Sequence, residues 1–145
     1  YKPDALKKII QNNSLKFGYD ICEEATLEIA KRSRGTPRIA IRLLKRILDF
    51  AIVKDMQLVD LKLVSDSLDL MRIDSAGLDE MDRKYLGCIN NNYSGGPVGI
   101  DTLSAALLEQ RDIIEDVIEP YLMQKGFVQR TPRGRIITKK GTDHL

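Results

Sequence analysis

Cysteine and histidine are scarce in this sequence of 145 residues, which has two cysteines and a single histidine. Cys22 and Cys88 both lie in helix-like apolar patterns, so we expect buried free thiols rather than a disulfide or a metal site. Free thiols fit a reducing compartment, and we predict a cytoplasmic protein. His144, the only histidine, is given no role. The sequence therefore predicts no metal-binding residues.

Long apolar runs are also absent. No run approaches the length of a membrane span or resembles a signal peptide, and 43% hydrophobic with 30% charged residues is typical of a globular protein. The length allows one ordinary domain or two small ones. The chain opens with Tyr1-Lys2-Pro3-Asp4 and no methionine, so we expect a piece of a longer protein.

Acidic residues are missing from two stretches of the chain. Residues 1–73 hold 14 basic and 10 acidic residues, a balance of +4, whereas residues 74–145 hold 9 and 11, a balance of −2. Lys31 to Arg46 contains seven basic residues and Lys125 to Lys140 contains six, and neither stretch has an acid. The net charge of +2 therefore hides two cationic segments, and each is a candidate for binding an anion.

The first half is predicted to be a small bundle of four helices, because apolar residues recur at helical spacing after capping residues. The predicted helices run from Pro3 to between Ser14 and Gly18, from a capping Asp20 to Arg32, from Pro37 to about Val53, and from Leu61 to about Met71. Thr36 and Asp60 stand where N-caps belong, and Pro37 suits a first helical position. Residues 72–77 are predicted to be a linker.

The second half predicts a different architecture. Its expected elements are a helix over 78–93, a short extended piece at 98–100, a helix capped by Asp101 and ending at Leu108, a helix over 111–125 bent at Pro120, and a hairpin pairing 127–131 with 135–138. Thr131-Pro132-Arg133-Gly134 supplies the turn. This order is typical of a winged helix-turn-helix domain, so the fold class is mainly α with a short β-hairpin wing.

Charge placement favours the wing as the DNA contact. The would-be recognition helix and its approach hold Glu109, Asp112, Glu115, Asp116 and Glu119 against a single Arg111, so phosphates would be repelled from most of that surface. The hairpin, in contrast, is cationic, and cations that displace counterions from phosphates gain affinity for any DNA sequence. A solvated charged hairpin and a protein-interaction module are the alternatives that these residues leave open.

The first cationic segment predicts a phosphate site at a helix start. Arg38 lies in the first turn of the helix that begins at Pro37, where the helix dipole already disfavours a cation by roughly 0.3–1 kcal/mol. Arg42 and Arg46 follow at spacings of four, where like charges repel by a few tenths of a kcal/mol. Helix amides, the dipole and guanidinium groups together suit an anion. A plain basic helix face is the alternative.

The motifs resemble those of a known family. The stretches are RSRGTPRIA at 32–40, RLLKRILDFA at 42–51, LDEMDRKYL at 78–86, GGPVGIDTLSAAL at 95–107, IEDVIEPYL at 114–122 and QRTPRGR at 129–135. They closely resemble the C-terminal part of RuvB, the AAA+ family of motors that drive Holliday-junction branch migration in bacteria. The resemblance covers essentially the whole chain. It implies an AAA+ lid domain over 1–73 and a winged-helix domain over 74–145.

The resemblance also implies roles for individual residues. In the family, the arginine of a GTPR motif reaches the nucleotide phosphates, which corresponds to Arg38, and the tyrosine that opens the lid contacts ATP, which corresponds to Tyr1. The expected cofactor is ATP or ADP, with a magnesium ion in the intact motor. Nucleotide state would move the lid, and the lid would move the winged helix on the duplex.

The expected DNA-binding residues lie in the second half. They are Arg111, which precedes the long helix, and the wing residues Arg130, Arg133 and Arg135. The resemblance further implies duplex and Holliday-junction DNA, RuvA and RuvC as partners, and a homohexamer when the motor is intact.

The chain departs from the family in one respect. It contains no G-x-x-x-x-G-K-[ST] motif and no acidic Walker-B strand, so we expect no ATP hydrolysis by this piece alone. Two other classes stay open: a winged-helix DNA-binding regulator, which leaves Gly35 to Arg38 unexplained, and an AAA+ initiator or clamp-loader relative, which would have a different C-terminal domain.

Overall fold

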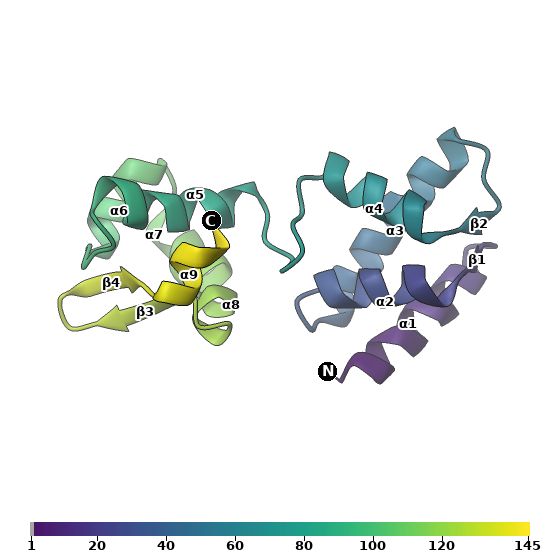
Figure 1. The fold of residues 1–145 in the computed structure, drawn as a ribbon, viewed down its shortest axis with the longest axis horizontal. Coiled ribbons are helices and arrows are strands. Elements are labelled where there is room, and N and C mark those ends of the chain that lie inside the picture. The colour runs from purple at the N-terminus through teal and green to yellow at the C-terminus, as the bar shows by residue number, and fades with distance from the viewer. Residues whose placement is uncertain (1) are drawn as a thin grey trace. The chain divides into compact units, whose positions relative to one another are not determined.

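The computed structural model describes residues 2–145, and these divide into two compact units (Figure 1). The first unit extends to Asp79 and the second runs from Glu80 to Leu145. We predicted the division after residue 73, a few residues earlier. Tyr1, the predicted ATP contact, lies outside the described residues. The mainly helical fold class is confirmed, and no helix in the described part of the chain is long and apolar enough to cross a membrane.

The first unit is a helical bundle. Its helices are α1 (Pro3–Lys16), α2 (Glu23–Arg32), α3 (Pro37–Val53) and α4 (Leu61–Leu70). α1 packs against α2 and α3, and α4 also packs against α2 and α3. Ile10, Ile29, Leu44, Ile47 and Leu68 are fully buried between them. Burying each such side chain stabilises the bundle by about 1.5–3 kcal/mol.

Two helix starts follow the predicted chemistry. The Thr36 hydroxyl accepts a hydrogen bond from the Ile39 amide at 3.3 Å, and α3 begins at Pro37. Asp60 Oδ1 accepts one from the Leu63 amide at 2.8 Å at the start of α4. Each cap satisfies an amide that has no partner within its helix, and the predictions for both helices are confirmed.

The start of α2 differs from the prediction. Asp20 does not cap the helix; Asp20–Ile21 forms a short strand, β1, that pairs in parallel with β2 (Leu58–Val59). Cys22 stands at the N-cap position instead, without a side-chain cap. The strand pair is a contact between residues nearly forty positions apart, which local spacing does not reveal. Leu27 is exposed on α2.

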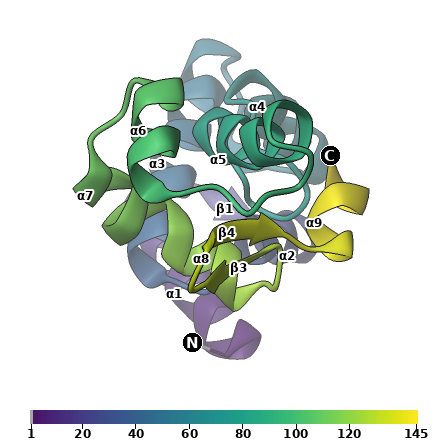
Figure 2. The ribbon, with the colours of Figure 1, turned by 90° about the vertical axis from the view of Figure 1, so that its left-hand side faces the viewer.

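In the second unit the helices lie around the hairpin: Figure 2 shows α5 above it, α6 and α7 on its left and α9 on its right. Its helical elements are α5 (Glu80–Gly87), which continues into the π-helical turn Cys88–Asn92, α6 (Ile100–Leu107), α7 (Arg111–Ile113), the π-helical turn Ile114–Ile118, α8 (Glu119–Gln124) and α9 (Lys139–His144). Tyr85, Leu86, Ile89, Leu103 and Leu122 are fully buried in its core.

Pro120 leaves a clear mark on the long helix. Because proline lacks an amide hydrogen and its ring clashes with the carbonyl four residues earlier, an ordinary α-helix cannot pass through it undisturbed. Here the helix widens into a π-helical turn at Ile114–Ile118 and resumes as α8, with Pro120 in its first turn. The extra residue in the wide turn shifts the following side chains around the helix, and Val117 is 61% exposed.

The start of α6 also corrects a prediction. α6 begins at Ile100 with Gly99 at the N-cap position, so Asp101 lies inside the first turn and does not cap the helix. Leu108, at its other end, adopts a left-handed conformation and is 91% exposed.

The hairpin is the predicted wing. β3 (Val128–Thr131) pairs antiparallel with β4 (Gly134–Ile137), and Pro132 and Arg133 form the turn. Val98 adds a bridge to Arg135 on the other edge of β4. Gly134 is required there, because a Cβ atom at this position would lie 2.6 Å from the Val98 carbonyl oxygen. In Figure 1 the turn extends away from the helices of its own unit.

Candidate anion-binding surfaces

The start of α3 presents Arg38 to solvent. Arg34 and Gly35 take positive φ angles of 59° and 72°, which turn the chain sharply out of α2 and into α3. Arg38 then follows in the first helical turn, exposed, with no hydrogen bond or ion pair to any described residue. Arg38 lies at the positive end of the helix dipole, which disfavours a cation, and no carboxylate among the described residues pairs with it. Its guanidinium is therefore available to an external anion.

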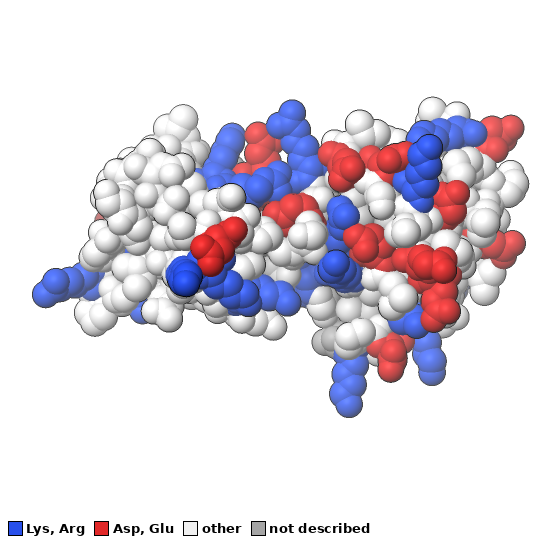
Figure 3. Space-filling model, viewed as in Figure 1, with Lys and Arg blue, Asp and Glu red and all other residues white. Residues whose placement is uncertain are grey.

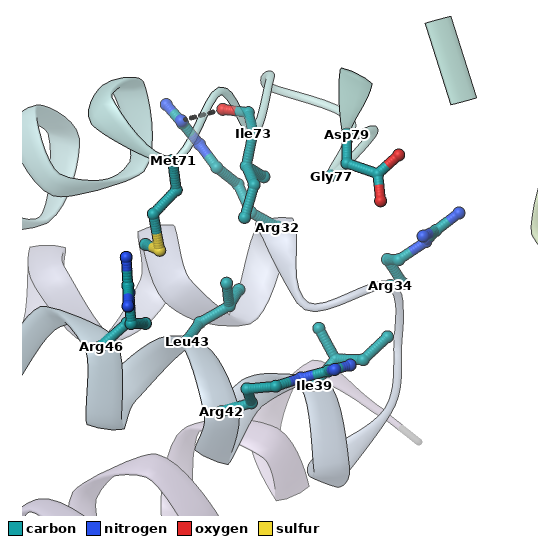
Figure 4. Close-up of a pocket in the computed structure, with 10 residues that line it drawn as sticks. All are labelled: Arg32, Arg34, Ile39, Arg42, Leu43, Arg46, Met71, Ile73, Gly77 and Asp79. Carbon is teal, nitrogen blue, oxygen red and sulfur yellow. Dashed lines mark hydrogen bonds between the residues drawn. The ribbon is translucent and has the colours of Figure 1, made fainter. Parts of the chain in front are cut away.

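A pocket of about 240 Å³ lies further along α3 (Figure 4). It is lined by Arg32, Arg34, Ile39, Arg42, Leu43, Arg46, Met71, Ile73, Gly77 and Asp79. Arg38 is not among these residues, so the structure does not join the three arginines of α3 in one site. Arg32 is committed to its neighbours: it pairs with Glu28 at 2.8 Å and donates to the Ile73 carbonyl at 3.0 Å.

The wing tip forms the exposed cationic surface of the second unit. Arg133 is exposed in the turn, and an open groove of about 420 Å³ runs between the hairpin and the start of α6. The groove is lined by Gly99, Ile100, Asp101, Thr102 and residues 130–135. On the face drawn in Figure 3, basic side chains lie at the hairpin turn and around α9.

Arg135 is placed differently from the prediction. It is 8% exposed, and its guanidinium makes two hydrogen bonds to the carboxylate of Glu119, at 2.9 and 3.2 Å. Glu119 is itself fully buried, and its carboxylate also accepts a hydrogen bond from the Tyr85 hydroxyl. Arg135 is therefore a poor candidate for the predicted DNA contact, because reaching a phosphate would leave a buried carboxylate without its main cation.

Arg130 and Arg111 share the carboxylates of the same helix. Arg130 lies 3.2 Å from Glu119 and 3.8 Å from Glu115, and its side chain remains 49% exposed. Arg111 pairs with Glu115 at 2.7 Å and with Asp101 at 3.7 Å. Both arginines are thus partly engaged within the unit while remaining reachable from solvent.

The network shifts the pKa values of its members. Burial, helped by the hydrogen bond to Glu119, raises the pKa of Tyr85 well above its ordinary value. The hydrogen bond to Glu119 raises the pKa of Arg135, and the hydrogen bond to Glu115 raises that of Arg111. The same Arg111 hydrogen bond lowers the pKa of Glu115. With these four pKa shifts, Tyr85 is neutral at neutral pH, Arg111 and Arg135 are positively charged, and Glu115 is negatively charged.

The sequence reading missed Glu119 and Tyr85 as partners of the wing. Glu119 was grouped with the acids that repel phosphate, whereas it points into the unit and holds the hairpin. The hairpin register could have indicated a buried carboxylate near the wing, because it sets Arg130 directly opposite Arg135. Like charges in directly opposed strand positions are destabilising, so a carboxylate is needed between them. Asp112 and Asp116 remain exposed and acidic, as predicted.

The described residues of the two units show no candidate cluster of metal ligands. No group of three or more histidine, cysteine, aspartate or glutamate side chains in residues 2–145 is arranged to hold a metal ion. Cys22 is partly buried and Cys88 is buried, and both are free thiols as predicted.

Comparisons with known proteins match both units. The family described as "RuvB AAA lid domain" matches residues 1–74, and the one described as "RuvB C-terminal winged helix domain" matches residues 75–145. The "Holliday junction branch migration complex subunit RuvB" of Paramagnetospirillum magneticum is 48% identical over the whole chain, which covers 42% of that protein. The protein of the same name from Rhodospirillum centenum is 49% identical, with 40% covered.

Solved structures agree with the sequence comparisons. The "Thermotoga maritima RuvB Holliday junction branch migration motor" superposes with a TM-score of 0.95 at 46% identity, over all of this chain and 49% of that one. Its R170A variant gives the same TM-score and identity. The chain thus spans less than half the length of these relatives.

Proposed function

This chain belongs to the RuvB family, and from that premise we propose that it forms the lid and winged-helix part of an ATP-dependent motor that migrates Holliday junctions. The observation that carries the proposal is the match of both units, in order, to the two C-terminal domains of one family. A winged-helix regulator or an AAA+ initiator would share one of these units and not both. The rest of the motor, with its ATP-hydrolysing core, would lie in the part of the relatives that this chain does not span.

Arg38 is the proposed nucleotide sensor of the lid. Its exposed guanidinium at the start of α3, free of internal carboxylates, suits contact with a charged phosphate, so the residues present fit a nucleotide. Bound nucleotide would supply the phosphate charge and, with magnesium held elsewhere in the motor, the energy of hydrolysis. The contribution of this chain is a fixed cation on a rigid helix, through which the position of the lid responds to the nucleotide. Tyr1 remains a proposed second contact.

The wing is the proposed contact with duplex DNA. Arg133 at the turn and the half-exposed Arg130 can reach phosphates, whereas Arg135 positions the hairpin through Glu119. Arg111 can contribute once its pairing with Glu115 is broken. Contacts to phosphate from an exposed turn carry little sequence information, which suits a motor that must move along any sequence.

The partners follow from the same premise. Duplex and four-way junction DNA are the proposed substrates, and other copies in a homohexamer, RuvA and RuvC are the proposed protein partners. The free thiols of Cys22 and Cys88 suit the reducing cytoplasm, where we place the protein.

Arg38→Ala in the intact motor tests the sensor. We expect ATP turnover and branch migration to fall together, because the lid would no longer respond to the phosphates. Lys45→Ala removes an exposed charge from the same helix and should leave both rates unchanged. Wild-type turnover in the Arg38 variant would refute the sensor role.

The 145-residue chain alone provides a second test. We expect no ATP hydrolysis above background, with or without DNA, since it has no phosphate cradle motif. A turnover rate that survives repurification and disappears in Arg38→Ala would contradict this expectation.

A further inference from the structure

The pocket beside α3 is a second cationic site of the lid, distinct from the surface at Arg38. Arg42 and Arg46 lie on successive turns of α3 and both line the pocket, whereas Arg38, one turn earlier, does not. Neither Arg42 nor Arg46 forms an ion pair with any described residue, although Arg46 lies over the ring of Phe50 at 6.0 Å. Like charges four residues apart on a helix are unfavourable, and no ion pair with a described residue offsets their repulsion.

The formal charge of the lining suits a doubly charged anion. Arg32 and Glu28 form a neutral pair. Of the remaining charged lining residues, Arg34 and Asp79 carry opposite charges, and Arg42 and Arg46 contribute +2. A single carboxylate would neutralise half of this charge, whereas a phosphate monoester near neutral pH carries about −1.5 to −2.

One wall of the pocket is apolar. Ile39, Leu43, Met71 and Ile73 supply it, and Leu43 is almost fully buried (Figure 4). Low polarity beside a guanidinium strengthens its attraction for an anion, because less water competes. The volume of about 240 Å³ is smaller than a pocket for a whole drug-sized ligand, so it suits the phosphate head of a ligand whose remainder lies outside.

We propose that this pocket binds a phosphate group, held by Arg42 and Arg46, independently of the nucleotide contact assigned to Arg38. The planar guanidinium fork matches phosphate oxygens in bidentate geometry, and two forks on successive helical turns can hold different oxygens of one group. The source can be inorganic phosphate or the phosphate of a mononucleotide, since the chemistry recognised is the same.

The test is a titration of the isotopically labelled chain with inorganic phosphate at constant ionic strength, followed by backbone amide NMR shifts. We expect saturable shifts at the residues that line the pocket. Arg42→Ala should weaken the fitted affinity about tenfold, as should Arg46→Ala, because each removes a charged hydrogen-bonding group. Adenosine monophosphate, titrated in parallel, separates the two sources by whether it saturates at lower concentration than phosphate.

Matched variants separate the pocket from general charge. Lys45→Ala removes a charge from α3 outside the pocket, and we expect it to retain phosphate affinity within about twofold. Arg42→Lys keeps the charge and loses the fork, so its affinity should fall between wild type and Arg42→Ala. Because these side chains are exposed, amide dispersion should show every variant folded.

Three results would overturn the proposal: shifts that fail to saturate, shifts that persist unchanged in Arg42→Ala combined with Arg46→Ala, and an equal loss in Lys45→Ala. A loss confined to Arg38→Ala would also overturn it, by placing phosphate at the proposed nucleotide contact instead. The sensor role of Arg38 is tested separately, by ATP turnover of the intact motor, so the outcome of the phosphate titration does not decide it.

Discussion

The two units use arginine in opposite ways. On α3 of the first unit, Arg38 and Arg42 have no carboxylate partner among the described residues. In the second unit, Arg111, Arg130 and Arg135 are all paired with Glu115 or Glu119. Both segments look equally cationic in the sequence. The comparison shows that the number of basic residues in a segment does not by itself indicate how strongly the segment can bind an anion. Basic side chains that form ion pairs within the unit must first be left out of the count.

The difference has a physical origin in the two architectures. One side of α3 supplies the bundle core, whereas Arg38 and Arg42 lie on its exposed side and form no ion pair with any described residue. The wing packs against α8, and the acids of that helix meet the arginines of the hairpin as the unit folds. Arg38 and Arg42 of α3 are therefore available to ligands, whereas part of the wing charge stabilises the fold.

The largest expected effect concerns the buried pair. Arg135→Ala leaves the Glu119 carboxylate buried without its main cation, so we expect the second unit to lose about 3–5 kcal/mol of stability. Hydrogen exchange measured by mass spectrometry can follow each unit separately, and exchange in β3 and β4 should accelerate while α3 is unaffected. Arg133→Ala, a tip residue, should change stability by no more than about 0.5 kcal/mol. Equal stability of the two variants would show that Arg135 is not structural.

The next largest effect tests whether Arg130 and Arg133 of the wing contact DNA phosphates. Arg130→Ala combined with Arg133→Ala should weaken duplex DNA binding and flatten the logarithmic salt slope by about two, because each phosphate contact contributes roughly one. Fluorescence anisotropy over a salt series measures this. Lys31→Ala combined with Lys62→Ala removes the same charge from the first unit and should leave the slope nearly unchanged. A wild-type slope in the wing variant would favour a protein-interaction module over a DNA contact.

A smaller effect tests whether paired arginines can be released. Glu115→Gln removes the shared partner of Arg111 and Arg130, so DNA binding should tighten by a few fold as their charge becomes available. Asp112→Asn removes one exposed negative charge from the same helix without freeing an arginine, and its gain should be smaller. If the two variants tighten binding equally, overall charge explains the gain and release does not.

The smallest effect is a pH dependence of stability. The Arg111 hydrogen bond lowers the pKa of Glu115 in the folded state, so the pair stabilises the fold above the ordinary glutamate pKa of about 4.3. That stability is lost as pH falls through the lowered folded pKa. Urea unfolding should show wild type slightly more stable than Glu115→Gln at pH 7, with the difference shrinking below about pH 4. A difference that is the same at pH 7 and pH 3 would contradict the pairing.

Local chemistry predicted much of this fold. The caps at Thr36 and Asp60 and the turn at Pro132 and Arg133 depend on a few neighbouring residues, and all were predicted. The β1–β2 pair joins segments that are distant in the sequence, so a spacing pattern does not predict it. The same holds for the π-helical turn before Pro120, because its form depends on how the helix packs in the folded unit.

The candidate sites show the same limit. The exposure of Arg38 could be anticipated from its place in the first turn of α3, because no acid lies within the surrounding stretch. The burial of Arg135 could not, because it depends on Glu119 sixteen residues away and on Tyr85 in another helix. Charge counting along the chain therefore located the cationic segments without distinguishing exposed arginines from buried, paired ones.

The central claim, that Arg38 and Arg42 of α3 are open whereas Arg135 of the wing is engaged, is tested most directly by NMR of the arginine Nε–Hε groups in the ligand-free chain. Arg135 should give a shifted Hε resonance that exchanges slowly with solvent, because its Nε donates to buried Glu119. Arg38 and Arg42 should exchange fast, with resonances near those of free arginine. Slow exchange at Arg38 and Arg42, or fast exchange at Arg135, would contradict the account.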